Sequence, residues 1–158
     1  MKTTTRTRTS ALVLAGSIAA LLAQFAAPSA LATTYYRDNN GATAGFGTAA
    51  GTWLSTGTVG GATQGWGTSS AGTVAPTGTI TTATTDTINF GNSGTGLAAG
   101  TITVSGTVSS GSMTFASGSG AIVLSGGTIT QAAAETITVN NTTDTISSIL
   151  AGATTSLT

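Results

Sequence analysis

The chain has 158 residues, with four Lys and Arg residues, four Asp and Glu residues, and neither His nor Cys. This composition excludes disulfide bonds, zinc sites built on Cys or His, and catalysis by an imidazole or a thiolate. It also argues against a nucleic-acid partner, because binding to a phosphate backbone needs clustered Lys and Arg.

The first 32 residues have the three parts of a secretory signal peptide. Residues 1–10 are basic, residues 11–23 are apolar, and Ala30 and Ala32 are the small residues that a signal peptidase recognises. The apolar run is shorter than the ~20 residues of a membrane-spanning helix. We therefore expect Sec-type export with cleavage after Ala32, and no membrane insertion of the remaining chain.

The exported part, residues 33–158, has a low apolar content. It keeps one cation and four acids, which gives a net charge of −3. Leu, Ile, Val and Phe fill only 22 of its 126 positions. That level is typical of disordered chains. An exported chain without Cys fits a bacterial envelope or extracellular protein better than a small disulfide-rich secreted domain.

The apolar residues nevertheless form short clusters in which they alternate with Thr and other small residues. The clusters are residues 87–90, 101–104, 112–115, 121–124, 136–139 and 145–146. Alternation with a period of two predicts half-buried β-strands, and the Gly, Ser and Asn residues between them predict turns. Almost nothing in residues 33–158 predicts a helix.

The clusters recur at nearly constant intervals. Ile88, Met113 and Ile137 occupy the same place in three successive clusters, at offsets of 25 and 24 residues. A second series, at offsets of 20 to 25 residues, consists of Ile102 and Val104, then Ile122 and Leu124, then Ile146 and Ile149. Repeats of this length with short strands are typical of β-solenoids.

We therefore predict an all-β fold, a right-handed single-stranded parallel β-helix in which Ile88, Met113 and Ile137 lie one above another. A narrow interior needs few apolar residues per strand, while Thr suits the outer face and Gly and Asn suit the corners. A β-sandwich is the alternative fold. The expected division is a signal peptide at 1–32, an aromatic, Gly-rich leader and cap at 33–79, and the repeats at 80–158.

Four segments carry a resemblance to a known family. They are residues 100–104 (GTITV), 118–127 (GSGAIVLSGG), 135–141 (ETITVNN) and 145–152 (TISSILAG). Together they resemble the passenger-associated strand repeat of bacterial autotransporters, and residues 35–67 are similar to the aromatic leader that often precedes such repeats. The resemblance covers most of residues 35–158.

This resemblance implies a structural, adhesin-like segment of a passenger at the bacterial cell surface or outer membrane, without catalysis. The expected partner is a cell-surface polysaccharide or a host or matrix surface. The membrane barrel that ends a complete autotransporter has no counterpart in this sequence, so we expect a truncated gene product, an N-terminal fragment of a longer passenger, or a protein secreted by another route. Its last coil would lack a cap, which predicts self-association through the unpaired strand edges.

The aromatic residues Tyr35, Tyr36, Trp53 and Trp66 gather in the leader and allow two interpretations. Solenoids need a cap over the apolar face of the first coil, and these side chains are suited to that role. Alternatively, the same four residues form a stacking surface for sugar rings, which would make the protein a glycan-binding module.

Two acids provide the only hypothesis of catalysis. Asp86 and Glu135 precede aligned strands two coils apart, which places their backbones about 10 Å from each other. Inverting glycosidases hold two carboxyl groups at a similar separation, so a polysaccharide-degrading β-helix enzyme is a second alternative. We favour solvated acids at the starts of two strands and expect no enzyme activity.

No cofactor or metal site is expected. The segment 38–41 (DNNG) has oxygen-bearing side chains and a glycine, but it lacks the alternating ligands and the distant Glu of a calcium-binding loop. We interpret it as a turn.

Overall fold

A computed structural model of the chain describes residues 31–59, 65–141, 143–152 and 156–157. These residues belong to one compact unit, Leu31–Thr158. All but the last two residues of the predicted signal peptide lie outside the described residues. The described part contains strands and no helix, as predicted, and so no helix in it is long and apolar enough to cross a membrane.

The strands are short, and fifteen of them lie in the described residues. In chain order they are β1 (Thr34–Asp38), β2 (Thr52–Leu54), β3 (Thr58–Val59), β4 (Gly65–Gly67), β5 (Thr79–Ile80), β6 (Thr87–Phe90), β7 (Gly100–Ser105), β8 (Thr107–Ser110), β9 (Met113–Phe115), β10 (Ile122–Ser125), β11 (Thr128–Gln131), β12 (Thr136–Val139), β13 (Thr145–Ile146), β14 (Ile149–Gly152) and β15 (Ser156–Leu157).

The largest sheet has the strand order β15-β12-β9-β6-β1-β4. Its neighbouring strands are parallel, except that β4 runs antiparallel to β1. Met113 of β9 is paired with Ile88 of β6 on one side and with Ile137 of β12 on the other. The predicted alignment of these three residues is therefore confirmed.

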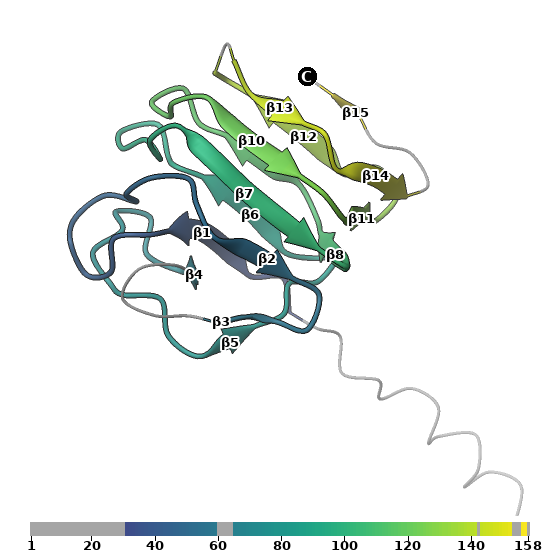
Figure 1. Cartoon of the computed structure of the whole chain (residues 1–158), viewed down its shortest axis with the longest axis horizontal. Helices are drawn as coiled ribbons and strands as arrows, with labels where there is room; N and C mark the ends of the chain where they lie inside the picture. Colours follow the sequence, from purple (N-terminus) through teal and green to yellow (C-terminus); the bar gives the residue numbers. More distant parts are fainter. Residues whose placement is uncertain (1–30, 60–64, 142, 153–155, 158) are drawn as a thin grey trace, which may run out of the picture. The chain divides into compact units, whose positions relative to one another are not determined.

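Two further sheets are parallel throughout, with the orders β13-β10-β7-β2 and β14-β11-β8. The chain visits the three sheets in the same order three times, and we call these segments pass 1 (87–110), pass 2 (113–131) and pass 3 (136–152). Figure 1 shows the resulting layers, with β2, β7, β10 and β13 following one another from blue to yellow.

The register aligns apolar residues of successive passes in rows. The rows are Ile88, Met113 and Ile137; Phe90, Phe115 and Val139; Ile102, Leu124 and Ile146; and Val108, Ile129 and Leu150. The members from passes 1 and 2 are all buried, and most have no exposed surface. They form the interior between the three sheets.

The second predicted series is wrong in its register. Ile102 is paired with Leu124, 22 residues later, and not with Ile122. Ile149 belongs to the third sheet, where it is paired with Thr128. The sequence pattern merged two neighbouring sheets because each strand of the third sheet contributes only one inward aliphatic residue.

Inward and outward residues alternate along each strand, which explains why so few apolar residues are enough to fill the interior. In β6 and β11 the residues are buried and half-buried in turn, with Thr or Asn on the outer face. Thr suits this position because it is both β-branched and polar. Where two layers meet at a corner, a Cβ on Gly96 would lie 1.8 Å from the carbonyl oxygen of Gly118, so only glycine fits there.

The leader is part of the same sheets rather than a separate region. Strand β1 pairs with β6 and β2 pairs with β7, both in parallel. Strands β3 and β5 form an antiparallel pair, and the predicted boundary between residues 79 and 80 falls inside β5. Residues 33–79 and 80–158 therefore share one compact unit.

A β-sandwich, the alternative fold, does not fit this pairing. Sandwiches are built from antiparallel sheets, whereas every pairing between passes in the described residues is parallel. The antiparallel pairs, β1 with β4 and β3 with β5, involve the leader.

Candidate functional site

The two tryptophans of the leader are buried, and they pack with aromatic side chains of passes 1 and 2. The rings of Trp53 and Trp66 meet edge to face, with their centroids 5.0 Å apart. Trp66 also meets Phe90 edge to face at 6.1 Å, and Phe90 stacks on Phe115 at 4.7 Å. The cluster continues the apolar interior into the leader.

This burial corrects the prediction that Trp53 and Trp66 contact a glycan. Trp53 is 0% exposed and Trp66 is 2% exposed. Stacking on a sugar needs a ring face that is open to solvent, and neither indole provides one. The register explains the result, because Trp53 is paired with the buried Val104 and Trp66 with the buried Arg37.

The indole of Trp53 is held by a hydrogen-bond chain that joins three parts of the fold. Its Nε1 donates to Oγ1 of Thr82 at 3.0 Å, and the Thr82 hydroxyl donates to the carbonyl oxygen of Ser109 at 2.5 Å. Strand β2, the segment before β6 and strand β8 are thus connected through one buried hydroxyl group.

Tyr35 and Tyr36, the other two predicted glycan contacts, are only half-buried. The ring of Tyr36 stacks on Phe46, with 5.7 Å between centroids and 10° between planes. Tyr35 is paired with Ile88 and extends the innermost row to the leader end. Both tyrosines therefore keep partly accessible rings beside the buried cluster.

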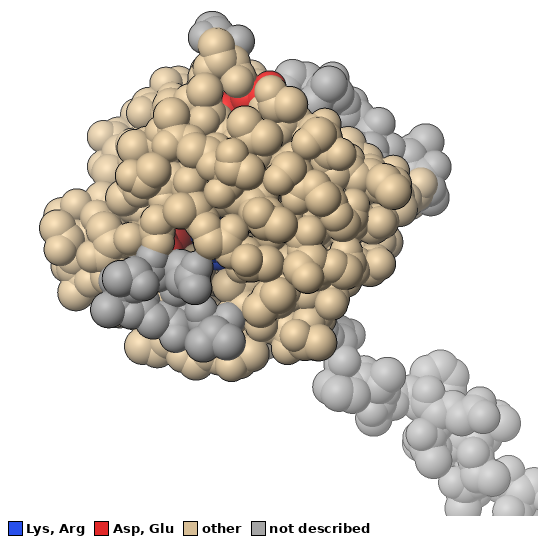
Figure 2. Space-filling view, viewed as in Figure 1, with Lys and Arg blue, Asp and Glu red and all other residues tan. Residues whose placement is uncertain are grey.

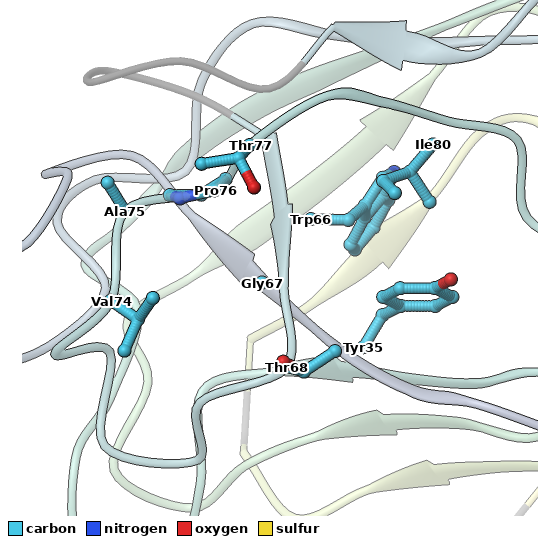
Figure 3. Close-up of a pocket in the computed structure, with 9 residues that line it drawn as sticks. All are labelled: Tyr35, Trp66, Gly67, Thr68, Val74, Ala75, Pro76, Thr77 and Ile80. Carbon is cyan, nitrogen blue, oxygen red and sulfur yellow. The ribbon is translucent and has the colours of Figure 1, made fainter.

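A small cavity lies beside Tyr35 at the leader end. It measures about 210 Å³ and is lined by Tyr35, Trp66, Gly67, Thr68, Val74, Ala75, Pro76, Thr77 and Ile80. Figure 3 shows Tyr35, Trp66 and Ile80 on one side of β4, and Ala75, Pro76 and Thr77 on the other. The lining has no charged group, and Trp66 Nε1 is buried without a hydrogen-bond acceptor among the described residues.

Arg37 has a role that the sequence did not predict. It is the one cation of residues 31–158, and it is 0% exposed. Its Nη2 donates to the carbonyl oxygen of Ala50 at 2.6 Å, and its Cζ lies 5.3 Å from the centroid of the Trp66 ring. Burial lowers the pKa of Arg37 to about 10, against an opposing contribution from Asp38.

Asp38 closes the turn predicted over residues 38–41. Its Oδ1 accepts a hydrogen bond from the backbone N–H of Asn40 at 3.0 Å, and Asn39 Nδ2 donates to the carbonyl oxygen of Thr48 at 2.7 Å. Gly41 has a φ of 71°, which favours glycine. Burial raises the pKa of Asp38, although hydrogen bonds from the backbone of Asn40 and Asn39 oppose the shift.

Asp86 is buried, in contrast to the solvated acid that we predicted. Its two carboxylate oxygens accept hydrogen bonds from the backbone N–H groups of Thr33, at 3.0 Å, and Ala83, at 2.7 Å. Its own carbonyl oxygen accepts from the N–H of Gly111 at 2.7 Å. One residue thus joins the start of the leader to the segment before pass 1 and to the turn between passes 1 and 2.

Glu135 is half-buried, and its carboxylate accepts a hydrogen bond from a side-chain hydroxyl rather than from backbone N–H groups. Its Oε2 accepts a hydrogen bond from the hydroxyl of Ser112 at 2.7 Å, and Ser112 Oγ also accepts from the N–H of Thr136 at 3.3 Å. The hydrogen bonds of Asp86 and Glu135 therefore connect neighbouring layers. Nothing in the described residues brings the two carboxylates to a common reacting group.

The described residues contain no group of three or more acidic side chains that could hold a metal ion. Searches against protein families, curated proteins and solved structures find no match for this chain. Each charged side chain of the described residues makes hydrogen bonds that hold turns and layers together.

Two features of the site, the inward position of Arg37 and the burial of Trp66, were not predicted from the sequence. The inward position of Arg37 follows from alternation with Tyr35, two residues before it on the same strand, and could have been inferred once β1 was recognised. The burial of Trp66 could not, because it depends on the antiparallel pairing of β4 with β1 across a long loop.

Proposed function

We propose that residues 33–158 form a right-handed parallel β-helix and serve as a structural, adhesin-like segment of an exported bacterial surface protein. The observation that carries this proposal is the register of the three parallel sheets. Each pass adds one strand to each sheet, and the same inward positions recur in every layer. Further layers of the same kind would extend a stiff rod by ~4.8 Å each.

The charge distribution supports a role outside the cell. The face in Figure 2 has very few charged atoms, and hydroxyl-bearing residues such as Thr101, Thr103 and Thr107 are exposed. Arg37, the one trypsin target of residues 31–158, is fully buried. We therefore expect the folded chain to resist proteases that cleave after Lys or Arg.

The outer face of the largest sheet supports an adhesive contact. Asn89, Thr114 and Thr138 are partners in adjacent strands and lie on its outer side. All three are half-buried and present amide or hydroxyl groups in a row. Such a row suits hydrogen bonding to a polysaccharide or to a polar matrix surface, the partners that the family resemblance implies.

Export is tested by expressing the full chain in a Gram-negative host and measuring the mass of the protein recovered outside the cytoplasm. We expect a product that begins at Thr33. Ala32→Leu should block cleavage, whereas Ala27→Leu, outside the peptidase recognition positions, should not. Uncleaved protein that stays in the cytoplasm would contradict the proposal.

The adhesive role is tested by displaying residues 33–158 on bacteria and counting the cells retained on polysaccharide-coated and matrix-coated surfaces. Met113→Asp serves as the control, because it places a charge in the interior while leaving the outer residues unchanged. We expect retention to rise for the native sequence and to return to background for the variant. Equal retention of both would refute an adhesive role for the folded segment.

A further inference from the structure

A second cavity lies on the outer face of the largest sheet, and it shares no lining residue with the cavity beside Tyr35. It measures about 220 Å³, and every residue that lines it is uncharged. The lining includes Tyr36 of the leader, Asn89 of pass 1, Thr114 of pass 2 and Asn140 of pass 3. Because neighbouring strands are ~4.8 Å apart, a lining that spans four layers forms a groove about 14 Å long across the strands. We call it the outer groove.

Small residues explain why the surface is hollowed here. The inward residues Phe90 and Phe115 are partners, and they are followed in the chain by Gly91 and Ala116, which are buried and line the groove. The backbone ladder continues at this point, because the N–H of Ala116 donates to the carbonyl oxygen of Phe90 at 3.1 Å. Pass 3 has the exposed Asn140 at the corresponding place. The outer groove thus has a floor of small residues and an amide at one end.

Tyr36 supplies an aromatic wall that is fixed in position. Phe46, which is 1% exposed, stacks on its ring with 5.7 Å between centroids and 10° between planes. The ring of Tyr36 itself stays half-buried and lines the outer groove. Tyrosine combines an apolar ring with a polar tip, so it can contact a ligand that has both kinds of surface.

The polar side chains of the lining are oriented by the fold. Asn92 Oδ1 accepts hydrogen bonds from two backbone N–H groups of its own turn, at 2.7 and 2.6 Å. Asn89 Nδ2 donates to the carbonyl oxygen of Tyr35 at 3.3 Å, which sets the direction of its amide. Asn140 is exposed and Thr114 is half-buried, so an amide and a hydroxyl group remain accessible to a ligand.

We infer that the outer groove binds a short stretch of a neutral polysaccharide. One sugar ring lies against Tyr36, and the chain continues along the groove toward Asn140. A sugar ring has an apolar face of C–H groups and a rim of hydroxyl groups that both donate and accept hydrogen bonds. The amide and hydroxyl side chains of the lining likewise offer donors and acceptors. This inference rests on the adhesive role proposed above and names the chemical class of its partner.

The lack of charge in the outer groove determines which polysaccharides fit. A uronate or sulfate group would leave water without gaining a cation, which is costly. Arg37, the one cation of residues 33–158, is 0% exposed and faces the interior. The net charge of −3 in these residues also repels polyanions. Neutral sugars avoid both costs.

The size of the outer groove favours a linear polymer over other partners. A matrix protein needs a contact of ~800 Å² on each side for a stable interface. Sites that enclose a drug-sized ligand measure ~300–1,000 Å³, which is more than the 220 Å³ of this cavity. The outer groove therefore suits a few groups of a longer chain that passes over the surface.

The test is an NMR titration of the exported chain, labelled with nitrogen-15. The probes are neutral oligosaccharides of glucose, of mannose and of N-acetylglucosamine, with oligogalacturonate as the anionic comparison. The side-chain amide signals of Asn89 and Asn140 report whether a sugar binds in the outer groove. The change of these signals with concentration gives the dissociation constant.

Four variants separate binding from folding. Tyr36→Ala removes the ring, whereas Tyr36→Phe keeps it. Asn140→Ala removes an exposed amide, and it remains informative if the loss of the contact between Tyr36 and Phe46 prevents folding of Tyr36→Ala. Thr103→Ala is the control, because Thr103 is an exposed residue of β7 in another sheet. Circular dichroism of the variants should agree with that of the native chain.

We expect at least one neutral oligosaccharide to shift the amide signals of Asn89 and Asn140, and oligogalacturonate to leave them unchanged. Tyr36→Ala should raise the dissociation constant about tenfold or more, and Asn140→Ala about two- to tenfold. Tyr36→Phe and Thr103→Ala should bind like the native chain. The inference is overturned if no neutral sugar shifts these signals, if oligogalacturonate binds more tightly, or if Asn140→Ala and a folded Tyr36→Ala bind like the native chain.

Retention of cells that display the chain distinguishes a failure of this inference from a failure of the adhesive role. Retention on matrix protein without retention on neutral polysaccharide would overturn the inference and leave the adhesive role standing. Equal retention of native and Tyr36→Ala cells on neutral polysaccharide would do the same, because adhesion would then use another surface. Sugar binding in solution without retention on any surface would contradict the adhesive role alone.

Discussion

Met113 is the parallel-strand partner of Ile88, and neither side chain has any exposed surface. The two residues are 25 positions apart in the sequence and belong to successive passes. Contacts of this kind, repeated along four rows, let a chain rich in Thr, Ser and Gly form a continuous apolar interior. The predictions below test how much of the stability resides in these contacts.

The first prediction concerns the centre of the innermost row. Met113→Ala should lower the free energy of unfolding by about 2–5 kcal/mol, because it leaves a cavity between Ile88 and Ile137. Thr114→Ala changes the neighbouring residue on the outer face and should cost no more than about 0.5 kcal/mol. Urea denaturation of both variants makes the comparison, and equal losses would show that Met113 does not face the interior.

The second prediction separates a structural role of Asp86 from a catalytic one. Asp86→Ala leaves the N–H groups of Thr33 and Ala83 without their acceptors and should cost about 1–3 kcal/mol in the free energy of unfolding. Glu135→Gln should cost less, because Gln still accepts the hydrogen bond from Ser112. An Asp86 variant as stable as the native chain, but deficient in cleaving a polysaccharide, would contradict this assignment.

The third prediction uses the two tryptophans as reporters of burial. Their emission should be shifted to short wavelengths, and acrylamide should quench it several-fold less in the folded protein than in urea. Sugars added to the folded protein should leave the emission unchanged, because both indole rings are covered. A sugar that quenches or shifts the emission would restore Trp53 and Trp66 as candidate glycan contacts.

The fourth prediction concerns acid stability. Burial raises the pKa of Asp144, against the hydrogen bond from Ile122, and burial likewise raises the pKa of Asp38. A raised pKa means that the folded chain binds the proton more tightly than the unfolded chain. The contribution of these two groups to stability therefore increases as the pH falls through their folded pKa values, and it is lowest at neutral pH.

Denaturation of the native chain and of Asp144→Asn, at neutral pH and near pH 4, measures this contribution. The Asn side chain is uncharged at both pH values, and its amide oxygen can still accept the hydrogen bond from the N–H of Ile122. We expect its stability to change less between the two pH values than that of the native chain. The same change in both proteins would show that Asp144 does not titrate as its burial requires.

The sequence predicted the innermost row and the strands of the first two sheets from residue 87 to residue 146, because apolar and small residues alternate in them at nearly constant offsets. It did not resolve the third sheet, whose strands contribute only Val108, Ile129 and Leu150 as inward aliphatics. Arg37 and the buried Asp86 each have a hydrogen-bond partner that lies more than ten residues away, at Ala50 and Thr33 respectively. Local patterns carry no information about such contacts.

The central claim is that successive passes lie in parallel register around one interior, and methyl NOE spectroscopy tests it most directly. Met113 is the one methionine besides Met1, so its labelled methyl group gives an unambiguous signal once Met1 has been removed or assigned. The account predicts NOEs from the Met113 methyl group to methyl groups of both Ile88 and Ile137. A folded protein in which Met113 shows an NOE to neither, or to only one of them, would contradict it.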